Sequence, residues 1–205
     1  MADKITNIIE STDLIEDCGR GHACSFCPNE SDCSLNQENH NRLHVETRLG
    51  KINWVVPVIA NKGGVGKSTV AANLAVALAQ LGYAVGLADA DIHGPNAPRF
   101  FGLQDSRVKV SERGVDTPCH PIDGRGSLRI GSLAFLLAEQ NTPIVWRDAY
   151  KHDYIHHMLG SFDWGVLDYL IVDMPPGTGN ELITLTDALK GCNTSAVLVS
   201  SADAI

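Results

Sequence analysis

Apolar and polar positions follow different patterns on the two sides of residue 51. From Lys51 onward, short apolar runs alternate with amphipathic segments, which is typical of a parallel β-sheet flanked by helices. Strands are expected at the continuous apolar runs, over 54–60, 83–88, 128–135, 167–172 and 195–200. Helices are expected over 67–81, 148–159 and 181–190. In the first of these, the apolar residues that share one face are Val70, Ala71, Leu74, Ala77, Leu78 and Leu81. The pattern therefore predicts an α/β fold.

Residues 1–50 show no such organisation. They are polar and acidic, lack a long periodic apolar face, and hold four of the six cysteines of the chain. We therefore expect a small cysteine-rich segment and linker over 1–50, followed by one main domain over 51–205.

Composition restricts the function classes. The chain has 205 residues, of which 44% are hydrophobic and 20% charged, so it can form one sizeable core. A net charge of -8 without a clustered Lys/Arg face argues against nucleic acid as a partner. No apolar run reaches the roughly 18 residues of a membrane span, and the acidic start MADKITNIIESTDLIEDC lacks a signal peptide pattern. We expect a cytoplasmic protein without a membrane partner, in which cysteines serve metal or redox chemistry rather than disulfides.

A glycine-rich stretch, ANKGGVGKST at 60–69, lies between the first expected strand and the first expected helix. This is the position of a phosphate-binding loop, whose glycines let the backbone curl and direct N–H groups at phosphate oxygens. Lys67 would reach the β and γ phosphates, and the Ser68 hydroxyl would ligate Mg²⁺. A plain tight turn has no use for Gly-Lys-Ser at its end. The general pattern has glycine where this chain has Asn61, a residue type that tolerates left-handed backbone angles. The expected nucleotide contacts are Gly63, Gly64, Val65, Gly66, Lys67, Ser68 and Thr69.

Two further motifs place carboxylates at strand ends beside this loop. DADIHGPNAP at 89–98 directly follows one expected strand, and YLIVDMPPGTG at 169–179 puts Asp173 at the end of another. The carboxyl ends of parallel strands meet at one edge of the sheet. Asp173 is therefore expected to hold a magnesium-bound water, and Gly177 to offer its N–H to the γ-phosphate, which would make its loop sensitive to hydrolysis. A single Asp at a strand end is more often a cap, but three motifs in this order favour a nucleotide site.

The cysteine-rich segment contains four thiols in the spacing Cys18-x5-Cys24-x2-Cys27-x5-Cys33. Four thiolates suit one metal centre. Zinc also favours C-x-x-C, although structural zinc sites usually use two such pairs and this segment has one. Free thiols are the third interpretation, and His22 is an alternative ligand to Cys18.

Residues 51–200 resemble the Mrp group of iron–sulfur cluster carrier ATPases, which includes the cytosolic nucleotide-binding-protein scaffolds. The match is carried by KGGVGKS at 62–68, DADIHGPNAP at 89–98, VWR at 145–147 and DWGVLDYLIVDMPPGTG at 163–179. The first motif is shared with cell-division and partitioning ATPases, whereas the second and fourth are closer to the carriers. The resemblance implies a P-loop NTPase fold and an ATP-dependent scaffold or carrier that delivers clusters to apo iron–sulfur proteins, with slow Mg-ATP hydrolysis.

The resemblance also implies individual roles. Lys62 is the extra lysine of the deviant loop and would reach across a dimer, with a second copy or a related subunit, to the partner's nucleotide. Asp91 would position the attacking water, and Asp89 would support Mg²⁺ or the switch loop. The stretch CSFCPNESDC is similar to the ferredoxin-like segment of the scaffold subgroup, where four cysteines hold a [4Fe-4S] cluster. The ligands implied here are Cys18, Cys24, Cys27 and Cys33, and the cofactors are ATP, Mg²⁺ and that cluster.

The chain departs from this group in three places. Asp148-Ala149 stands where the group has Gly-Pro, and Ser200-Ser-Ala-Asp203 where it has Thr-Thr-Pro-Gln. The group continues beyond the equivalent of Ile205 with adenine contacts and a C-x-x-C pair, so we expect an incomplete ATPase domain, as in a truncated product or one half of a split protein. The alternatives are a positioning ATPase, which would need a basic patch or an amphipathic membrane helix, and a non-hydrolysing metal- and nucleotide-binding module.

Overall fold

The computed structural model describes residues 18–202, except 22, 25, 26, 28, 92, 93, 107, 136–148 and 178. Its main sheet has six strands in the order β5-β6-β2-β7-β1-β8. These strands are β1 (Ile52–Ile59), β2 (Ala84–Asp89), β5 (Cys119–His120), β6 (Ser127–Ser132), β7 (Leu167–Asp173) and β8 (Val197–Leu198). All neighbouring pairs are parallel except β5 with β6. The predicted α/β fold with a mainly parallel sheet is confirmed.

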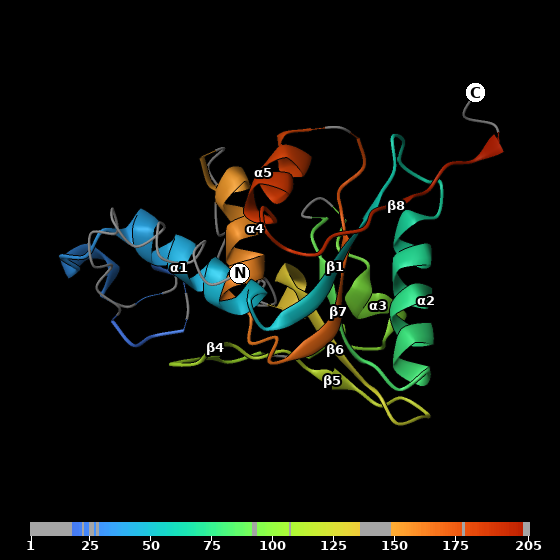
Figure 1. Cartoon of the computed structure of the whole chain (residues 1–205), viewed down its shortest axis with the longest axis horizontal. Coiled ribbons are helices and arrows are strands. Elements are labelled where there is room, and N and C mark those ends of the chain that lie inside the picture. The colour runs from blue at the N-terminus through green and yellow to red at the C-terminus, as the bar shows by residue number, and fades with distance from the viewer. Residues whose placement is uncertain are drawn as a thin grey trace, which may run out of the picture.

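Helices cover both faces of this sheet (Figure 1). They are α1 (Gln37–Leu49), α2 (Lys67–Gln80), α3 (Ala97–Phe100), α4 (Ala149–Ser161) and α5 (Asn180–Ala188). One core cluster joins the sheet to α1, α4 and α5, and the other joins it to α2 and α3. A small hairpin of β3 (Val110–Ser111) and β4 (Gly114–Val115) lies apart from the sheet, and 3₁₀ turns occur at η2 (Glu30–Asp32) and η3 (Leu133–Phe135).

Two predicted strands are shorter in the structure. The strand expected over 128–135 ends at Ser132, because the Ser132 hydroxyl accepts the Ala134 N–H at 3.2 Å and turns the chain into η3. The strand expected over 195–200 is reduced to Val197–Leu198 at the edge of the sheet, beside β1. Apolar runs predict the presence of a strand better than its end, because the end depends on side-chain bonds of this kind.

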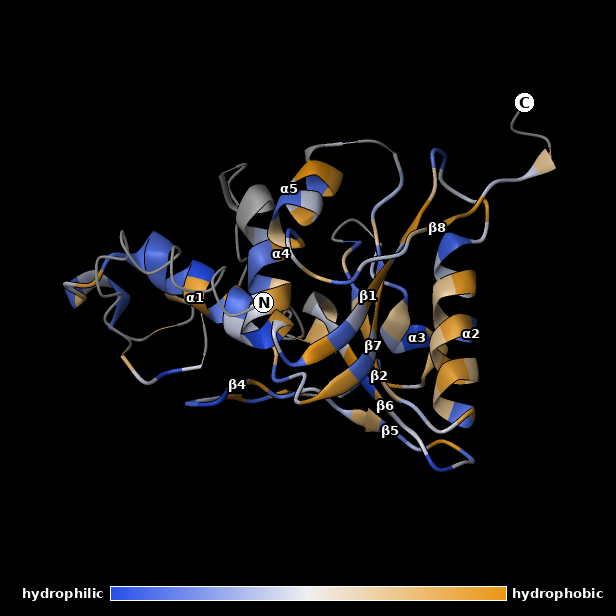
Figure 2. Ribbon diagram, in the orientation of Figure 1, coloured by the Kyte–Doolittle hydropathy of each residue, from blue (hydrophilic) through white to orange (hydrophobic). Residues whose placement is uncertain are grey.

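Helix α2 packs on the sheet through a face that partly matches the predicted one, because Val70, Ala71, Leu74 and Leu78 belong to the core cluster or pack against it. Ala71, Ala75 and Ala79 are fully buried, whereas Leu81 is 75% exposed. Figure 2 shows that α2 carries hydrophobic residues on more than one side, so the apolar pattern alone does not choose its buried face. Small side chains let the helix approach the strands closely, which favours the alanine face.

The sequence pattern did not predict α1. Asn36 caps it by accepting the Asn39 N–H at 3.0 Å, and its buried face carries His40 and Arg48 beside Val45 and Leu49. Polar residues on the packed face hide the apolar period, and Figure 2 shows α1 as largely hydrophilic. Val45 and Leu49 belong to the same core cluster as α4, so α1 packs on the domain that begins at residue 51.

Candidate functional site

The glycine-rich loop connects β1 to the first turn of α2, as predicted. Gly64 and Gly66 adopt φ angles of 78° and 92°, which favour glycine. A Cβ added to Gly63, Gly64 or Gly66 would meet no atom within 4 Å, so the space in front of the loop is open to a ligand. No described non-glycine residue has a positive φ, so Asn61 does not use the left-handed conformation that we expected to help close the loop.

A cavity of about 310 Å³ lies in front of this loop. Its lining joins loop residues to the segment after β2 and to the loop after β7. The lining residues are Lys62, Gly63, Gly64, Gly66, Lys67, Ser68, Thr69, Asp91, Asn96, Phe100 and Pro176. The predicted loop contacts, except Val65, thus line one cavity at the N-terminus of α2, where the helix dipole favours anions.

Lys67 forms an ion pair with Asp173 in this structure. The Lys67 ammonium donates to Asp173 Oδ1 and lies 3.4 Å from the Ser68 hydroxyl oxygen. Both charged side chains are almost completely buried, with 6% and 3% exposed. Asp173 lies beside Asp89 in the β2–β7 register and beside Val58 in the β1–β7 register, so the parallel sheet brings it to the loop. The Lys67 ammonium, the Ser68 hydroxyl and the Asp173 carboxylate therefore lie close together, as binding of a magnesium triphosphate requires.

Asp89 is fully buried and holds the loop that follows β2. Its Oδ1 accepts the Asp91 N–H at 3.3 Å, and its Oδ2 accepts the Ala97 N–H at 3.0 Å and the Ser132 hydroxyl at 3.2 Å. Burial raises the pKa of Asp89 to about 7; the Ala97 N–H bond opposes this rise and the nearby charge of Asp173 adds to it. Of its two predicted roles, this geometry fits support of the loop better than direct ligation of Mg²⁺.

Asp91 occupies the cavity side of the same loop. Its Oδ1 accepts the Gly94 N–H at 3.2 Å, and the residue is among those that line the cavity. A carboxylate here can face a ligand in the cavity, which Asp89 does not. The DAD motif predicted that both carboxylates emerge at the end of this strand, but it did not predict that Asp89 would be buried while Asp91 lines the cavity.

The Gly177 N–H does not face the cavity in this structure. It donates to the Ala60 carbonyl at 2.9 Å, with Gly177 at a φ of 101°. The expected contact between this N–H and a γ-phosphate therefore requires the bond to Ala60 to break first.

Tyr154 is a part of the site that no motif indicated. Its hydroxyl donates to the Asp89 carbonyl oxygen at 2.6 Å, and burial raises its pKa well above 10. This hydrogen bond connects α4 to the end of β2, next to the loop whose N–H groups Asp89 accepts. A single tyrosine in an amphipathic helix carries no sequence signal for such a role.

The cysteine-rich segment lies against α1. Cys24 is buried; its N–H donates to Asn41 Oδ1 at 2.9 Å, and its sulfur lies 3.3 Å from His40 Nδ1. The sulfur of Cys18 lies 3.4 Å from His40 Nε2, and that of Cys27 lies 3.8 Å from the guanidinium of Arg20. Burial raises the pKa of Cys24 to about 11, with further contributions from Cys33, Cys18 and Cys27. The four predicted thiols thus belong to one electrostatic neighbourhood.

Within the described part of the chain, no three His, Cys, Asp or Glu side chains are placed to share a single metal ion. A zinc site, the rival to the expected cluster, is therefore not preformed among these residues, and His22 lies outside them. A [4Fe-4S] cluster keeps its thiolates farther apart than one ion does, since each binds a different iron of the cube. The chemistry of the donor set, four thiols in one neighbourhood, fits such a cluster.

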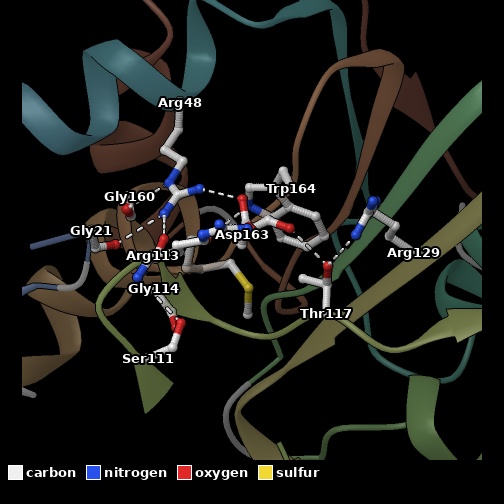
Figure 3. Close-up of polar contacts among 11 residues, drawn as sticks. Gly21, Arg48, Ser111, Arg113, Gly114, Thr117, Arg129, Gly160, Asp163 and Trp164 are labelled. Carbon is white, nitrogen blue, oxygen red and sulfur yellow. Dashed lines mark hydrogen bonds and ion pairs between the residues drawn. The ribbon is translucent and has the colours of Figure 1, made fainter. Parts of the chain in front are cut away.

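Arg48 fastens this segment to the main domain (Figure 3). Its guanidinium donates to Gly21 O at 3.0 Å, to Gly160 O at 3.3 Å, to Asp163 Oδ1 at 2.6 Å and to the Arg113 carbonyl. These acceptors come from the cysteine-rich segment, the end of α4, the loop between α4 and β7, and the β3–β4 turn. A cavity of about 370 Å³ also opens here, away from the phosphate loop. No sequence signal predicts this junction, because a buried arginine in a polar helix has the same sequence pattern as a solvent-exposed one.

The order of loop, aspartates and strands described above defines a P-loop NTPase. Residues 51–205 match the family model described as "ParA: NUBPL iron-transfer P-loop NTPase", and the chain belongs to this family. It is 41% identical over 149 residues to an iron–sulfur cluster carrier protein of Saccharolobus solfataricus, covering 73% of this chain and 49% of that protein. It is 38% identical to the cytosolic Fe-S cluster assembly factor NUBP1 homolog of Brugia malayi, covering 90% and 60% of the two chains.

A nucleotide-binding protein of Archaeoglobus fulgidus, solved in complex with ADP, has a similar structure. The TM-score is 0.65 at 37% identity, and the match covers 80% of this chain and 62% of that one. This chain spans about half the length of the curated relatives it matches, with coverage from 42% of the carrier of Aquifex aeolicus to 62% of that of Methanocaldococcus jannaschii. Among the described residues, no helix is long and apolar enough to cross a membrane.

Proposed function

We propose that this protein is an ATP-dependent scaffold or carrier of iron–sulfur clusters, which binds a [4Fe-4S] cluster and delivers it to apoproteins. The observation that carries the proposal is that α1 joins a four-thiol segment to a phosphate-loop domain within one packed body. Relatives named as cluster carriers and as cytosolic assembly factors support both the activity and a cytoplasmic location.

Residues in and beside the cavity would each have a separate role in ATP hydrolysis. When a triphosphate enters, the Lys67 ammonium exchanges its bond from Asp173 to phosphate oxygens, and Asp173 becomes available to a magnesium-bound water. Ser68 would ligate Mg²⁺, which neutralises developing phosphate charge, while Asp91 would orient the attacking water. The Gly177 loop would respond to the γ-phosphate by exchanging its bond to Ala60.

A dimer would complete the hydrolytic site. Lys62 is exposed and lines the cavity, so its ammonium would be available to a nucleotide bound by a facing subunit. Two nucleotides held between subunits would concentrate phosphate charge at the interface, which a cation from each side offsets. The partner in this arrangement is a second copy or a related subunit.

Metal analysis after anaerobic isolation tests the proposal. We expect iron and acid-labile sulfide in comparable amounts, and a broad absorbance near about 400 nm from thiolate ligation of iron. The double variant Cys24→Ala/Cys27→Ala should lose both, and the exposed Cys119→Ala is the matched control that should keep them. Transfer to an apo iron–sulfur acceptor should be accelerated by Mg-ATP. Stoichiometric zinc without iron would instead support the metal- and nucleotide-binding module.

A further inference from the structure

One face of α1 lies against Cys24. The residues are Gln37, His40 and Asn41, whose spacing of three and four places them on one side of the helix. The Gln37 carbonyl lies 3.9 Å from the Cys24 sulfur, and the Asn41 side chain accepts the Cys24 N–H. The helix thus fixes both the backbone and the sulfur of this cysteine.

The His40 imidazole lies between two cysteine sulfurs. Nδ1 is 3.3 Å from Cys24 Sγ, and Nε2 is 3.4 Å from Cys18 Sγ. A neutral imidazole carries one N–H and an imidazolium carries two. Because each ring nitrogen faces a sulfur, an N–H of His40 points at a cysteine sulfur in every tautomer and protonation state.

The position of this ring is set by the fold rather than by the cysteines alone. His40 is 2% exposed and makes an edge-on contact with His44 one turn later, with ring centroids 4.4 Å apart. The same helix is anchored on α4 by Val45 and Leu49 and on the Arg48 junction. Because the fold already holds the His40 ring in place, the ring does not have to become ordered when a cysteine thiolate forms beside it.

We propose that His40 is a positioning residue of the N-terminal cluster centre, and that it donates an N–H···S hydrogen bond to a ligating Cys18 or Cys24 thiolate. The inference rests on the proposed cluster and names a residue outside the cysteine motif. Hydrogen bonds to cluster sulfurs stabilise the more negative, reduced state and thereby raise the reduction potential. They also orient the ligand, and loss of such an outer partner typically lowers metal affinity by about 10- to 100-fold.

Two substitutions of similar size separate the donor from the packing. His40→Gln keeps an N–H donor, whereas His40→Met fills comparable space without one. His120→Met is the matched control, since that ring lies on β5 against Phe101, outside the cysteine-rich segment. Each protein is reconstituted anaerobically, and we would measure its midpoint potential by a titration followed by electron paramagnetic resonance and its rate of cluster loss to a chelator. ATP binding by each variant reports that the domain is folded.

We expect His40→Met to have a more negative midpoint potential and to lose its cluster about 10- to 100-fold faster, in line with the affinity range above. His40→Gln should lie between it and the wild type, and His120→Met should match the wild type. Equal potentials and retention in all four proteins would overturn the role of His40 and leave the proposed function standing. A wild-type protein that takes up no iron–sulfur cluster would overturn both.

Discussion

The lysines of the phosphate loop have different surroundings, although they are five positions apart in one motif. Lys67 is buried against Asp173, whereas Lys62 is exposed and lines the same cavity. We therefore expect the first to act on a nucleotide bound within its own subunit, and the second on one bound by a facing subunit.

This difference predicts distinct effects of the two alanine substitutions. Lys67→Ala should weaken ATP binding and also destabilise the fold by about 3–5 kcal/mol, because it leaves the buried Asp173 carboxylate unpaired. Lys62→Ala should leave both binding and stability near wild type and suppress hydrolysis. Calorimetric titration with ATP, thermal unfolding and turnover measure the three effects. Equal losses of ATP affinity in the two variants would contradict the division between them.

Asp89 should make stability depend on pH. Its pKa is raised from 3.8 to about 7 in the folded protein, so the folded state holds this proton more strongly than the unfolded state. The resulting stabilisation is fully present below about pH 4 and is lost as the pH rises through about 7, with a size of at most about 4 kcal/mol. Asp89→Asn removes the titration.

Urea unfolding between about pH 4 and 8 measures this effect. The free energy of unfolding of the wild type should fall relative to that of Asp89→Asn across the range. Loss of the hydrogen bond to the Ala97 N–H changes the free energy of unfolding of Asp89→Asn by a constant amount. It does not change how that free energy depends on pH. Parallel profiles for the two proteins would show that Asp89 stays ionised in the folded state.

At the scale of elements, the β3–β4 hairpin touches the cysteine-rich segment at Gly114, where there is no room for a side chain. A Cβ on Gly114 would lie 2.4 Å from Ser161 O, 2.6 Å from Arg48 Nη2 and 2.7 Å from Gly21 O. Gly114 also has a φ of 120°, and the Ser161 hydroxyl nearby accepts the Ala23 N–H at 2.8 Å. The hairpin, the end of α4 and the segment that carries Cys24 are thus held at one point.

Gly114→Ala should therefore destabilise this junction by about 2–4 kcal/mol, from steric overlap together with backbone strain. Gly102→Ala is the matched control, because it has a φ of 66° and no atom within 4 Å of an added Cβ, so it carries the backbone strain alone. Thermal unfolding compares their stabilities, and limited proteolysis within residues 18–35 reports release of the segment. Equal losses of stability in Gly114→Ala and Gly102→Ala would mean that the atoms around Gly114 move aside at little cost in free energy.

At the scale of the whole molecule, α1 belongs to the core that the sheet shares with α4 and α5. Leu49 is 4% exposed and packs in the same cluster as Leu159 and Leu170. Helix α1 is therefore expected to unfold together with the phosphate-loop domain.

Leu49→Ala should lower the free energy of unfolding of the whole domain by about 2–4 kcal/mol, as a cavity in a packed core does. Thr47→Ala, at an exposed position of the same helix, should stay within about 0.5 kcal/mol of the wild type. Denaturation followed by circular dichroism and by tryptophan fluorescence should give one coincident transition. If Leu49→Ala left the main transition unchanged and created an early one, α1 would be an independent unit.

The sequence by itself determined the sheet, the phosphate loop and the two aspartate motifs. These features are local: a buried strand, a Gly-Lys-Ser turn and a carboxylate at a strand end each lie within about ten residues. Their order along the chain also brings them to one edge, since parallel strands place their carboxyl ends together.

Only the tertiary structure decided which partners these residues have. The pairing of Lys67 with Asp173, the bond from Tyr154 to Asp89, and the placement of His40 between Cys18 and Cys24 join residues far apart in the sequence. Helix α1 escaped prediction because its packed face includes His40 and Arg48, whose burial is favourable only when distant acceptors and sulfurs surround them. Hydrophobic periodicity records which side chains avoid water, and it carries no information about polar groups that are buried because their hydrogen bonds are made elsewhere in the fold.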